Sequence, residues 1–334
     1  MQGGLQMKIG CLLSGYEYIL TQGNIEAEVE NISYDSRKVT NRSIYVCIVG
    51  FNADGHNYIA EAISKGATVI IVEDDKREIT NDVAVIKVDS ARNALAFISS
   101  RFYGNQSAKL DIFGITGTRG KTSTADILNR LFDKLGLVTG IIGSKGNIVK
   151  NKTIEVSKNT KTTPESLELN KIIRGMRNEG ATHIILEVTS HALTLNRVDF
   201  CSFETGIFTN LYPEHLDFHK TMEDYKNAKL KLFKQCKHAV VNADDCFAKN
   251  IIKGNKNSIT YGINKNADVR ASKIERRNGV TNFELDYFGR KSPVRLRTED
   301  TFYLYNFLAA FSTCCIQGYD TGGLVSYISE EIEL

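Results

Sequence analysis

The sequence predicts an α/β protein with a small N-terminal α/β domain and a larger central domain, in which helices flank a mostly parallel sheet. Two observations favour this class. Short apolar runs rich in β-branched residues alternate with helix-like stretches along most of the 334 residues, and a glycine-rich turn joins one such strand to a helix. Strands that are apolar along their whole length are typical of parallel sheets covered on both faces.

The N-terminal domain is expected over residues 1–105. Its strands are predicted at 43–50, 67–72 and 83–88, and its helices at 57–66 and 90–104. The strands are rich in Val and Ile, which favour the extended conformation. This part of the chain is therefore expected to form a compact α/β unit of its own.

The central domain is expected over residues 106–320. Strands are predicted at 109–116, 137–143, 182–188, 204–211 and 238–244, and helices at 122–136, 164–180 and 222–236. Gly136 is placed to cap the first of these helices. Short antiparallel strands between 267 and 296 and a helix at 301–318 follow, and residues 321–334 look like the start of another helix.

The composition excludes several classes of protein. A formal net charge of +3 is too balanced to indicate binding to nucleic acid or to an anionic membrane. No apolar run approaches 18 residues, and the N-terminus lacks the features of a signal peptide. Seven cysteines without a CxxC pair argue against disulfides or a zinc site and place most of these residues in the core. The expected compartment is the cytoplasm.

The segment from Gly114 to Ser123 is the strongest local signal, because it places a glycine loop, a lysine and a hydroxyl residue between a strand and a helix. Gly117 and Gly120 would let backbone N–H groups approach phosphate oxygens, and Lys121 would neutralise their charge. The Thr122 hydroxyl is placed to coordinate Mg²⁺. The alternative is a chance glycine turn before a helix.

Polar residues also follow two other predicted strands. Glu187 ends one strand and could hold Mg²⁺, or it could be a strand-end carboxylate facing solvent. After another strand, five polar residues within ten positions suggest a site loop, namely Asn210, Glu214, His215, Asp217 and His219. The next helix carries four lysines, and helical spacing alone does not select one of them: Lys226, Lys229, Lys231 and Lys234.

Together these motifs closely resemble the Mur ligases, which are ATP-dependent, amide-forming enzymes of peptidoglycan precursor synthesis. The family's TGTxGKT loop is similar to residues 116–122. The subtype that adds the third stem-peptide residue, UDP-N-acetylmuramoyl-tripeptide synthetase (MurE type), is indicated by four further segments: YDSR (34–37) with DGH (54–56), TTPES (162–166), EVTSHAL (187–193) and NLYPEHLDFHKTMEDYKNAKLKLF (210–233).

The resemblance implies roles for individual residues. Lys121, Lys229 and His215 would be catalytic. ATP would contact the phosphate loop and one later residue: Gly117, Thr118, Arg119, Gly120, Lys121, Thr122, Ser123 and Asn306. The UDP-N-acetylmuramoyl-dipeptide would contact Ser36, Arg37, His56, Thr162, Thr163, Ser190 and Arg197. Magnesium ions would be held by Thr122, Glu187, His215 and Lys229, with Lys229 converted by CO₂ into a carbamate.

The sequence departs from the family in two places. Thr189 stands where the first residue of a Ser-Ser pair is usual, and Pro213-Glu214 replaces an Arg-Asp pair beside the proposed metal ligand His215. The family also has a third, C-terminal domain, and residues 321–334 would be its start. The chain is therefore expected to lack that domain, and the residues that would select the incoming amino acid belong to it.

Three functions are compatible with these features. The preferred one is a ligase that joins an amino acid to UDP-N-acetylmuramoyl-L-Ala-D-Glu through an acyl phosphate, acting as a monomer without nucleic-acid or membrane partners. The second is a truncated, non-catalytic module that binds the UDP-muramoyl peptide and a nucleotide. The third is an unrelated P-loop ATPase or kinase, for which the DSR, DGH and TTP segments would be coincidences.

Overall fold

The computed structural model describes the whole chain except residues 1–6, 75–78, 80–81, 157–159 and 332–334. Two compact units are present. Unit 1 comprises 1–106, 164–171 and 195–200, and unit 2 comprises 107–163, 172–194 and 201–334. The expected single cut near residue 105 does not anticipate the two later segments, which return to unit 1.

Unit 1 is built on a five-stranded sheet in the order β2-β7-β6-β5-β4. The strands are β2 (Ile19–Gln22), β4 (Asn31–Ser33), β5 (Ser43–Val46), β6 (Ala67–Val72) and β7 (Ala84–Lys87), and the main helices are α1 (Ile9–Leu13), α2 (Ile59–Ser64) and α3 (Ala91–Phe102). Two further short strands, β1 (Met7–Lys8) and β3 (Glu28–Val29), pair with each other in antiparallel orientation and form a separate two-stranded sheet. Only β2 is antiparallel to its neighbour in the sheet.

Both faces of the unit 1 sheet are buried, as its continuously apolar strands predict. On β5, Ile44 and Val46 belong to one apolar cluster, which also includes residues of α1 and α3. Tyr45, between them, belongs to a second cluster, which includes residues of α2. The alternation follows from the period of two in a strand.

Unit 2 contains an eleven-stranded sheet in the order β11-β10-β9-β12-β8-β13-β14-β15-β16-β17-β18. The strands from β9 to β16 in that order are parallel, and the pairs at both ends are antiparallel. Their bounds are β8 (Asp111–Thr116), β9 (Thr139–Gly143), β10 (Gly146–Val149), β11 (Lys152–Thr153), β12 (His183–Glu187), β13 (Phe203–Phe208), β14 (Cys236–Asn242), β15 (Ser258–Gly262), β16 (Val269–Arg277), β17 (Val280–Tyr287) and β18 (Arg290–Leu296).

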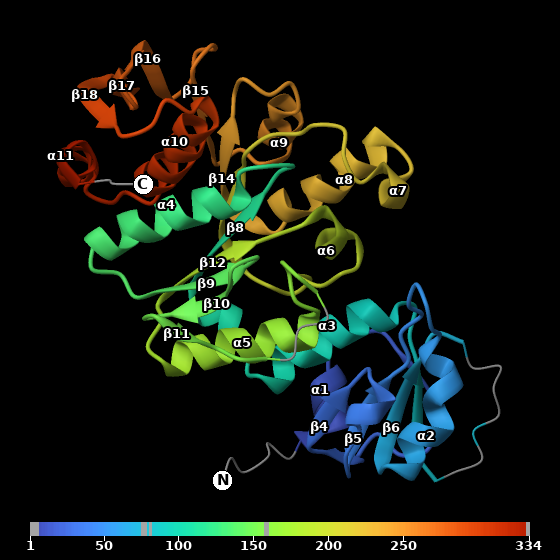
Figure 1. Cartoon of the computed structure of the whole chain (residues 1–334). Helices are drawn as coiled ribbons and strands as arrows, with labels where there is room; N and C mark the ends of the chain where they lie inside the picture. Colours follow the sequence, from blue (N-terminus) through green and yellow to red (C-terminus); the bar gives the residue numbers. More distant parts are fainter. Residues whose placement is uncertain (1–6, 75–78, 80–81, 157–159, 332–334) are drawn as a thin grey trace. The chain divides into compact units, whose positions relative to one another are not determined.

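Helices cover both faces of this sheet. Helices α4 (Lys121–Lys134) and α10 (Thr301–Ile316) lie side by side on one face (Figure 1), where Phe113, Ile185 and Ile207 from the strands complete the apolar core. The remaining helices are α5 (Ser166–Asn178), α6 (Ser190–Thr194), α7 (Leu216–His219), α8 (Met222–Phe233), α9 (Ala248–Gly254) and α11 (Thr321–Glu331). Leu324 and Ile328 of α11 belong to the same core, so this helix is part of unit 2.

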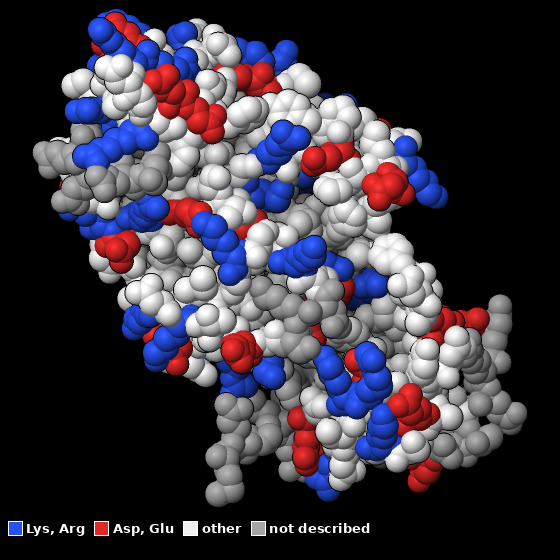
Figure 2. Space-filling view, viewed as in Figure 1, with Lys and Arg blue, Asp and Glu red and all other residues white. Residues whose placement is uncertain are grey.

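The mixed α/β class is confirmed, and all of the predicted strands and helices occur. The prediction missed several short elements without a strong periodic pattern, namely β1, β2, β3, β4, β10, β11, β15, α1, α6, α7 and α9. Both signs of charge are interspersed over the visible face (Figure 2). Within the described residues, no helix has the length and apolar character needed to cross a membrane.

Candidate functional site

The phosphate loop lies between β8 and α4, where the sequence predicts it. Gly120 is left-handed with a φ of 87°, and a Cβ atom there would overlap the Asn306 side chain. At Gly117 a Cβ atom would overlap the Thr209 hydroxyl. Both positions therefore require glycine, and the loop backbone passes directly beside β13 and α10.

The end of β13 holds this loop in place. Asn210 Oδ1 accepts a hydrogen bond from the Arg119 N–H at 2.9 Å, and Asn210 O accepts one from the Thr118 N–H at 2.9 Å. Thr209 Oγ1 donates to Arg119 O at 2.7 Å. The Arg119 backbone is therefore fixed, whereas Arg119 as a residue is exposed.

Lys121 reaches back over the loop from the first turn of α4. Its Nζ donates to Gly117 O at 2.9 Å and to Thr118 O at 3.0 Å. Burial lowers the pKa of Lys121, and the carboxylates of Glu187 and Glu214 oppose that shift. These partners are uncharged carbonyl oxygens, and a phosphate group at this loop would supply anionic oxygens for the ammonium to contact.

Glu187 is 1% exposed at the end of β12, so the alternative of a carboxylate facing solvent is wrong. Its Oε2 accepts a hydrogen bond from Thr122 Oγ1 at 2.9 Å and another from Ser144 Oγ at 3.3 Å, and its Oε1 accepts one from the Ser144 N–H at 3.0 Å. A Cβ atom on Gly143 would overlap Oε1. Sequence reasoning missed Ser144, whose position after a strand that neighbours β12 was the available signal.

Among the described residues, no group of three or more His, Cys, Asp or Glu side chains could hold a metal ion. Thr122 and Glu187 nevertheless bring a hydroxyl oxygen and a carboxylate together next to the phosphate loop. Oxygen ligands of this kind suit Mg²⁺, which usually keeps several waters and completes its shell with substrate phosphates. The pair therefore fits a magnesium ion held jointly with a nucleotide.

Lys229 is the one lysine of α8 that is fully buried, at 1% exposed, whereas Lys231 and Lys234 are exposed. Its Nζ lies 4.5 Å from the centroid of the Tyr225 ring. Burial lowers the pKa of Lys229 far below its ordinary value, and the charge of Lys121 lowers it further. Within the described part of the chain, Lys229 makes no ion pair, so its neutral amine is favoured.

Aromatic rings gather next to this lysine. The His191 ring stacks on Phe218 with centroids 4.1 Å apart, and His215 lies edge-on to His191 at 5.0 Å. Glu214, from the unusual Pro-Glu pair, lies 3.9 Å from His215 Nε2. Tyr225 OH and Thr118 Oγ1 share a hydrogen bond of 3.1 Å, which connects this cluster to the phosphate loop.

The predicted substrate residues of unit 2 lie around the end of β12. Thr162 Oγ1 is 3.1 Å from Ser144 Oγ. Thr163 is buried, and its hydroxyl donates to Glu187 O at 2.9 Å and accepts from the Thr189 N–H at 3.1 Å. Thr163 therefore stabilises the carboxyl end of β12 through two hydrogen bonds, a structural role that the sequence did not indicate.

In unit 1, Ser36 and His56 are buried and Arg37 is exposed. Ser36 Oγ donates to Glu61 at 2.7 Å, and Arg37 Nε forms an ion pair with Asp35 at 2.8 Å. His56 Nδ1 is 2.6 Å from Asp54 Oδ1. Each of these predicted substrate residues is thus held by an acidic neighbour.

Arg197, the fourth predicted substrate residue of unit 1, belongs to a largely buried charge cluster. Its Nε lies 2.8 Å from Glu165 Oε1, and Arg92 lies 3.4 Å from the other oxygen of the same carboxylate. The three side chains are between 11% and 18% exposed. One carboxylate therefore orients two guanidinium groups, and the cluster keeps a net positive charge.

A cleft of about 480 Å³ opens beside the phosphate loop in unit 2. Asn306 lines it and accepts a hydrogen bond from Thr124 Oγ1 at 3.3 Å. Tyr212 and Phe302 also line it, and both are about half exposed. Ser123 lies in the adjacent first turn of α4. The two exposed rings provide flat apolar surface next to a phosphate site.

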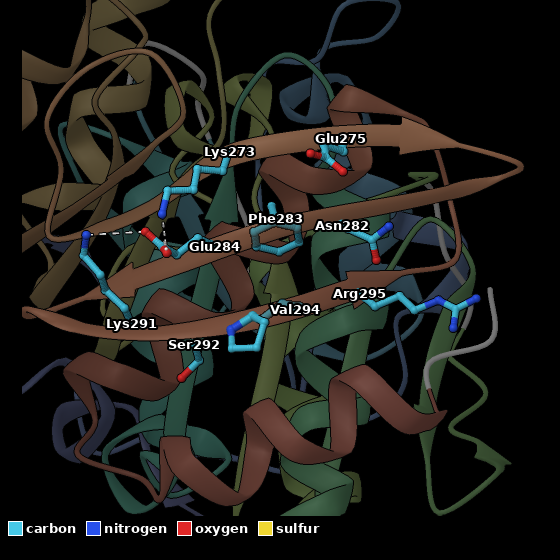
Figure 3. A pocket seen from close by; sticks show the side chains of 10 residues that line it. Lys273, Glu275, Asn282, Phe283, Glu284, Lys291, Ser292, Val294 and Arg295 are labelled. Carbon is cyan, nitrogen blue, oxygen red and sulfur yellow. Dashed lines mark hydrogen bonds and ion pairs between the residues drawn. The ribbon is translucent and has the colours of Figure 1, made fainter.

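A second hollow of about 540 Å³ lies on the outer face of β16, β17 and β18 (Figure 3). Its charges are paired, because Glu284 contacts Lys273 at 2.9 Å and Lys291 at 3.4 Å. Phe283 and Val294 are buried in the core of unit 2. This hollow contains none of the residues singled out by the sequence.

Comparison with known proteins agrees with these motifs. Residues 115–314 match the profile of the Mur ligase middle domain, and residues 28–103 match that of the Mur ligase family catalytic domain. A UDP-N-acetylmuramoyl-L-alanyl-D-glutamate--2,6-diaminopimelate ligase of Clostridium acetobutylicum is 40% identical over 97% of this chain and 67% of its own length. A ligase of the same name from Clostridium perfringens is 42% identical over 85% of this chain and 59% of its own length.

Solved structures show the same fold. A UDP-N-acetylmuramoyl-L-alanyl-D-glutamate--2,6-diaminopimelate ligase superposes with a TM-score of 0.85 at 24% identity, covering 99% of this chain and 68% of that one. A MurF ligase of Thermotoga maritima, solved with ADP, gives a TM-score of 0.61 at 22% identity, over 91% of this chain and 66% of that one.

The curated relatives are longer than this chain, which spans between 59% and 67% of the lengths of the two described. The match nevertheless extends over both units, and the middle-domain profile alone covers more than half of the chain. An unrelated P-loop ATPase or kinase is thereby ruled out. The chain belongs to the Mur ligase family.

Proposed function

We propose that this chain carries the nucleotide-binding and UDP-substrate-binding parts of an ATP-dependent ligase, which adds the third amino acid to UDP-N-acetylmuramoyl-L-Ala-D-Glu. The observation that supports this most directly is the juxtaposition of the phosphate loop, the Thr122–Glu187 pair and the buried Lys229 in a member of the Mur ligase family. The alternative is a module that binds the UDP-muramoyl peptide and the nucleotide through the same residues but forms no amide bond. A product assay distinguishes the two.

In this proposal ATP lies on the phosphate loop. The backbone N–H groups between Gly117 and Gly120 cradle its phosphates, and the Lys121 ammonium leaves its two loop carbonyls to contact phosphate oxygens. The base enters the cleft lined by Tyr212, Phe302 and Asn306. Aromatic rings beside a polar amide suit a purine, which offers two flat faces and a hydrogen-bonding edge.

Thr122 and Glu187 would hold one Mg²⁺, and His215 and a carbamate on Lys229 would hold a second. The magnesium ions would neutralise charge on the phosphate oxygens. Lys229 fits this role because a buried neutral amine can attack CO₂, forming an N–C bond and releasing one proton. The product is an anionic carboxylate in a place where an ammonium is disfavoured.

The reaction needs positioning and charge stabilisation more than covalent participation by the protein. An oxygen of the D-Glu carboxylate attacks the γ-phosphorus and ADP leaves, giving an acyl phosphate. The amine of the incoming amino acid then attacks the acyl carbon, and inorganic phosphate leaves as the amide forms. Lys121 stabilises charge on the transferring phosphoryl group, and the fixed loop backbone keeps that group in line.

For the UDP-muramoyl peptide, Ser36, Arg37 and His56 would contact the uridine diphosphate, while Arg197 would contact an anionic group. Thr162, Thr163 and Ser190 would contact the muramoyl-dipeptide. The acidic neighbours of the unit 1 residues fix their side chains in advance, which reduces the entropy lost on binding. We further propose 2,6-diaminopimelate as the incoming amino acid, because relatives near 40% identity carry that name.

The experiment incubates the chain with UDP-N-acetylmuramoyl-L-Ala-D-Glu, ATP, Mg²⁺ and bicarbonate, adds single amino acids, and measures product mass. A tripeptide product with diaminopimelate is expected of a complete catalyst. Binding of both ligands without product would support the binding module instead. Absence of dipeptide binding would overturn the proposal. ¹³C NMR with labelled bicarbonate tests the carbamate, which a Lys229→Arg variant should lack.

The cellular setting is also part of the proposal. We expect a cytoplasmic monomer without nucleic-acid or membrane partners, consistent with the mixed surface charge (Figure 2). Size-exclusion chromatography with light scattering would test the monomer. A stable dimer would contradict it.

A further inference from the structure

Ser190 and His219 form a buried pair that the sequence did not bring together. Ser190 begins α6, three residues after the end of β12, and is 2% exposed. His219 ends α7 and is 5% exposed. The distance between Ser190 Oγ and His219 Nε2 is 2.8 Å, which is that of a strong hydrogen bond. The Ser190 hydroxyl therefore has a fixed partner inside the protein.

The histidine ring is itself held on several sides. Its centroid lies 5.0 Å from that of Tyr225, 4.7 Å from that of Phe218 and 5.6 Å from that of His191. The His219 N–H also donates to His215 O at 3.0 Å within the short helix. A ring packed in this way cannot reorient easily, so its Nε2 keeps its direction toward Ser190.

The same contacts extend to the phosphate loop. Tyr225, against which His219 packs, is fully buried and shares its hydrogen bond with Thr118. A continuous series of buried side chains thus runs from the loop to the first residue of α6: Thr118, Tyr225, His219 and Ser190. Residues on four separate segments of unit 2 are locked together by this series.

We propose that His219 is a positioning residue that orients the Ser190 hydroxyl toward an anionic oxygen of the acidic UDP-muramoyl peptide. This inference rests on the proposed function, because it takes Ser190 as a substrate contact. The proposal takes the neutral tautomer that carries its proton on Nε2, in which the ring donates to Ser190 Oγ and the serine O–H is left to donate to a further acceptor. A hydroxyl donor suits a carboxylate or phosphate oxygen, which can only accept.

The test measures the dissociation constant of UDP-N-acetylmuramoyl-L-Ala-D-Glu by calorimetry. His219→Phe keeps a ring against Tyr225 but removes the donor, so we expect binding about tenfold weaker, as for Ser190→Ala, which is the scale of one hydrogen bond to a charged group. His219→Gln keeps an N–H near the position of Nε2 and should bind within about twofold of the native chain. ADP binding should be unchanged in all three variants.

A double variant tests whether His219 acts on dipeptide binding through Ser190. With Ser190→Ala in place, His219→Phe should weaken dipeptide binding no further, because the group that it positions is gone. A full additional loss in that background would overturn the proposal, as would native affinity in the single His219→Phe variant. His219→Asn, whose shorter amide falls short of Ser190, replaces His219→Phe if the latter does not fold.

His183 provides the matched control, because it is another buried histidine of unit 2, with its Nε2 3.0 Å from the Tyr319 hydroxyl. His183→Gln should lower the melting temperature and leave dipeptide binding unchanged. An equal loss of binding in that variant would show that general destabilisation, not positioning, explains His219→Phe. A native chain that fails to bind the dipeptide would instead overturn the proposed function.

Discussion

Strand β12 carries a buried histidine at its amino end and a buried glutamate at its carboxyl end, and the two ends differ in how their charges are balanced. At the amino end, His183 bonds to Thr182 and Tyr319 and lies 3.6 Å from Asp111. At the carboxyl end, Lys229 is buried and Lys121 partly buried, and neither forms an ion pair in the described part of the chain.

The polar groups at the amino end of β12 have partners inside the protein, whereas the two lysines at the carboxyl end form no ion pair with any described residue. A buried polar group with partners inside the protein needs nothing further, whereas a buried cation without a counter-charge is costly until an anion arrives. Carboxyl ends of parallel strands and amino ends of helices converge at only one edge of such a sheet. The two lysine side chains that lack an ion pair among the described residues therefore lie where phosphates would bind in the proposed function.

The largest expected effect is that of Lys121→Ala at the carboxyl end. In the proposed function the ammonium stabilises charge on the transferring phosphoryl group, so tripeptide formation should fall by about 10³-fold or more when it is removed. Dipeptide binding should stay within about twofold, because unit 1 residues make many of the proposed contacts. Product mass and calorimetry measure the two quantities, and substantial turnover in the variant would contradict the role of Lys121.

Glu165→Gln tests a charge cluster that, unlike the lysines, is internally paired. The variant removes the carboxylate that faces Arg92 and Arg197, which are largely buried, so the free energy of unfolding should fall by about 3 kcal/mol. Urea unfolding measures this change. Glu168→Gln is the control, because burial raises the pKa of the Glu168 carboxyl and Tyr34 is its hydrogen-bond donor. Equal losses in both variants would show that the arginines do not depend on Glu165.

Gly143→Ala should disturb Glu187 without removing it. The added methyl group overlaps Glu187 Oε1, so the carboxylate must shift away from Thr122 and Ser144. We expect the Mg²⁺ concentration for half-maximal turnover to rise about tenfold, with an overpacking cost of about 1–3 kcal/mol in stability. Magnesium titration of the variant checks this, and an unchanged requirement would argue against Glu187 as a ligand.

The smallest effect concerns the amino end of β12. Burial lowers the pKa of His183, and the charge of Asp111 opposes that shift only in part. Below the ordinary value near 6.5, the unfolded chain therefore takes up a proton that the folded chain refuses, and stability falls as the pH falls. His183→Gln should make the free energy of unfolding fall less steeply between about pH 6.5 and 5. Identical slopes would contradict this assignment.

Much of the site is encoded in local sequence. The phosphate loop is predicted by a contiguous motif, in which a strand is followed by a glycine loop, a lysine, a hydroxyl residue and a helix. All of these residues are close together in the chain. The pairing of Ser144 with Glu187 involves residues 43 positions apart, and that of Arg92 with Glu165 involves residues 73 positions apart. Only the strand order of the sheet and the return of residues 164–171 to unit 1 bring such residues together.

The lysines of α8 show which properties the sequence determines and which depend on the tertiary structure. By itself the sequence determines the alternation of strands and helices, the phosphate loop and the presence of several lysines on one helix. The residue pattern gives each of these lysines a similar chance of facing solvent. Packing of α8 against its neighbours buries Lys229 beside Tyr225 and leaves Lys231 and Lys234 exposed. Burial is a property of the assembled fold, and it is the main reason that the pKa of Lys229 is lowered, with a further contribution from the charge of Lys121.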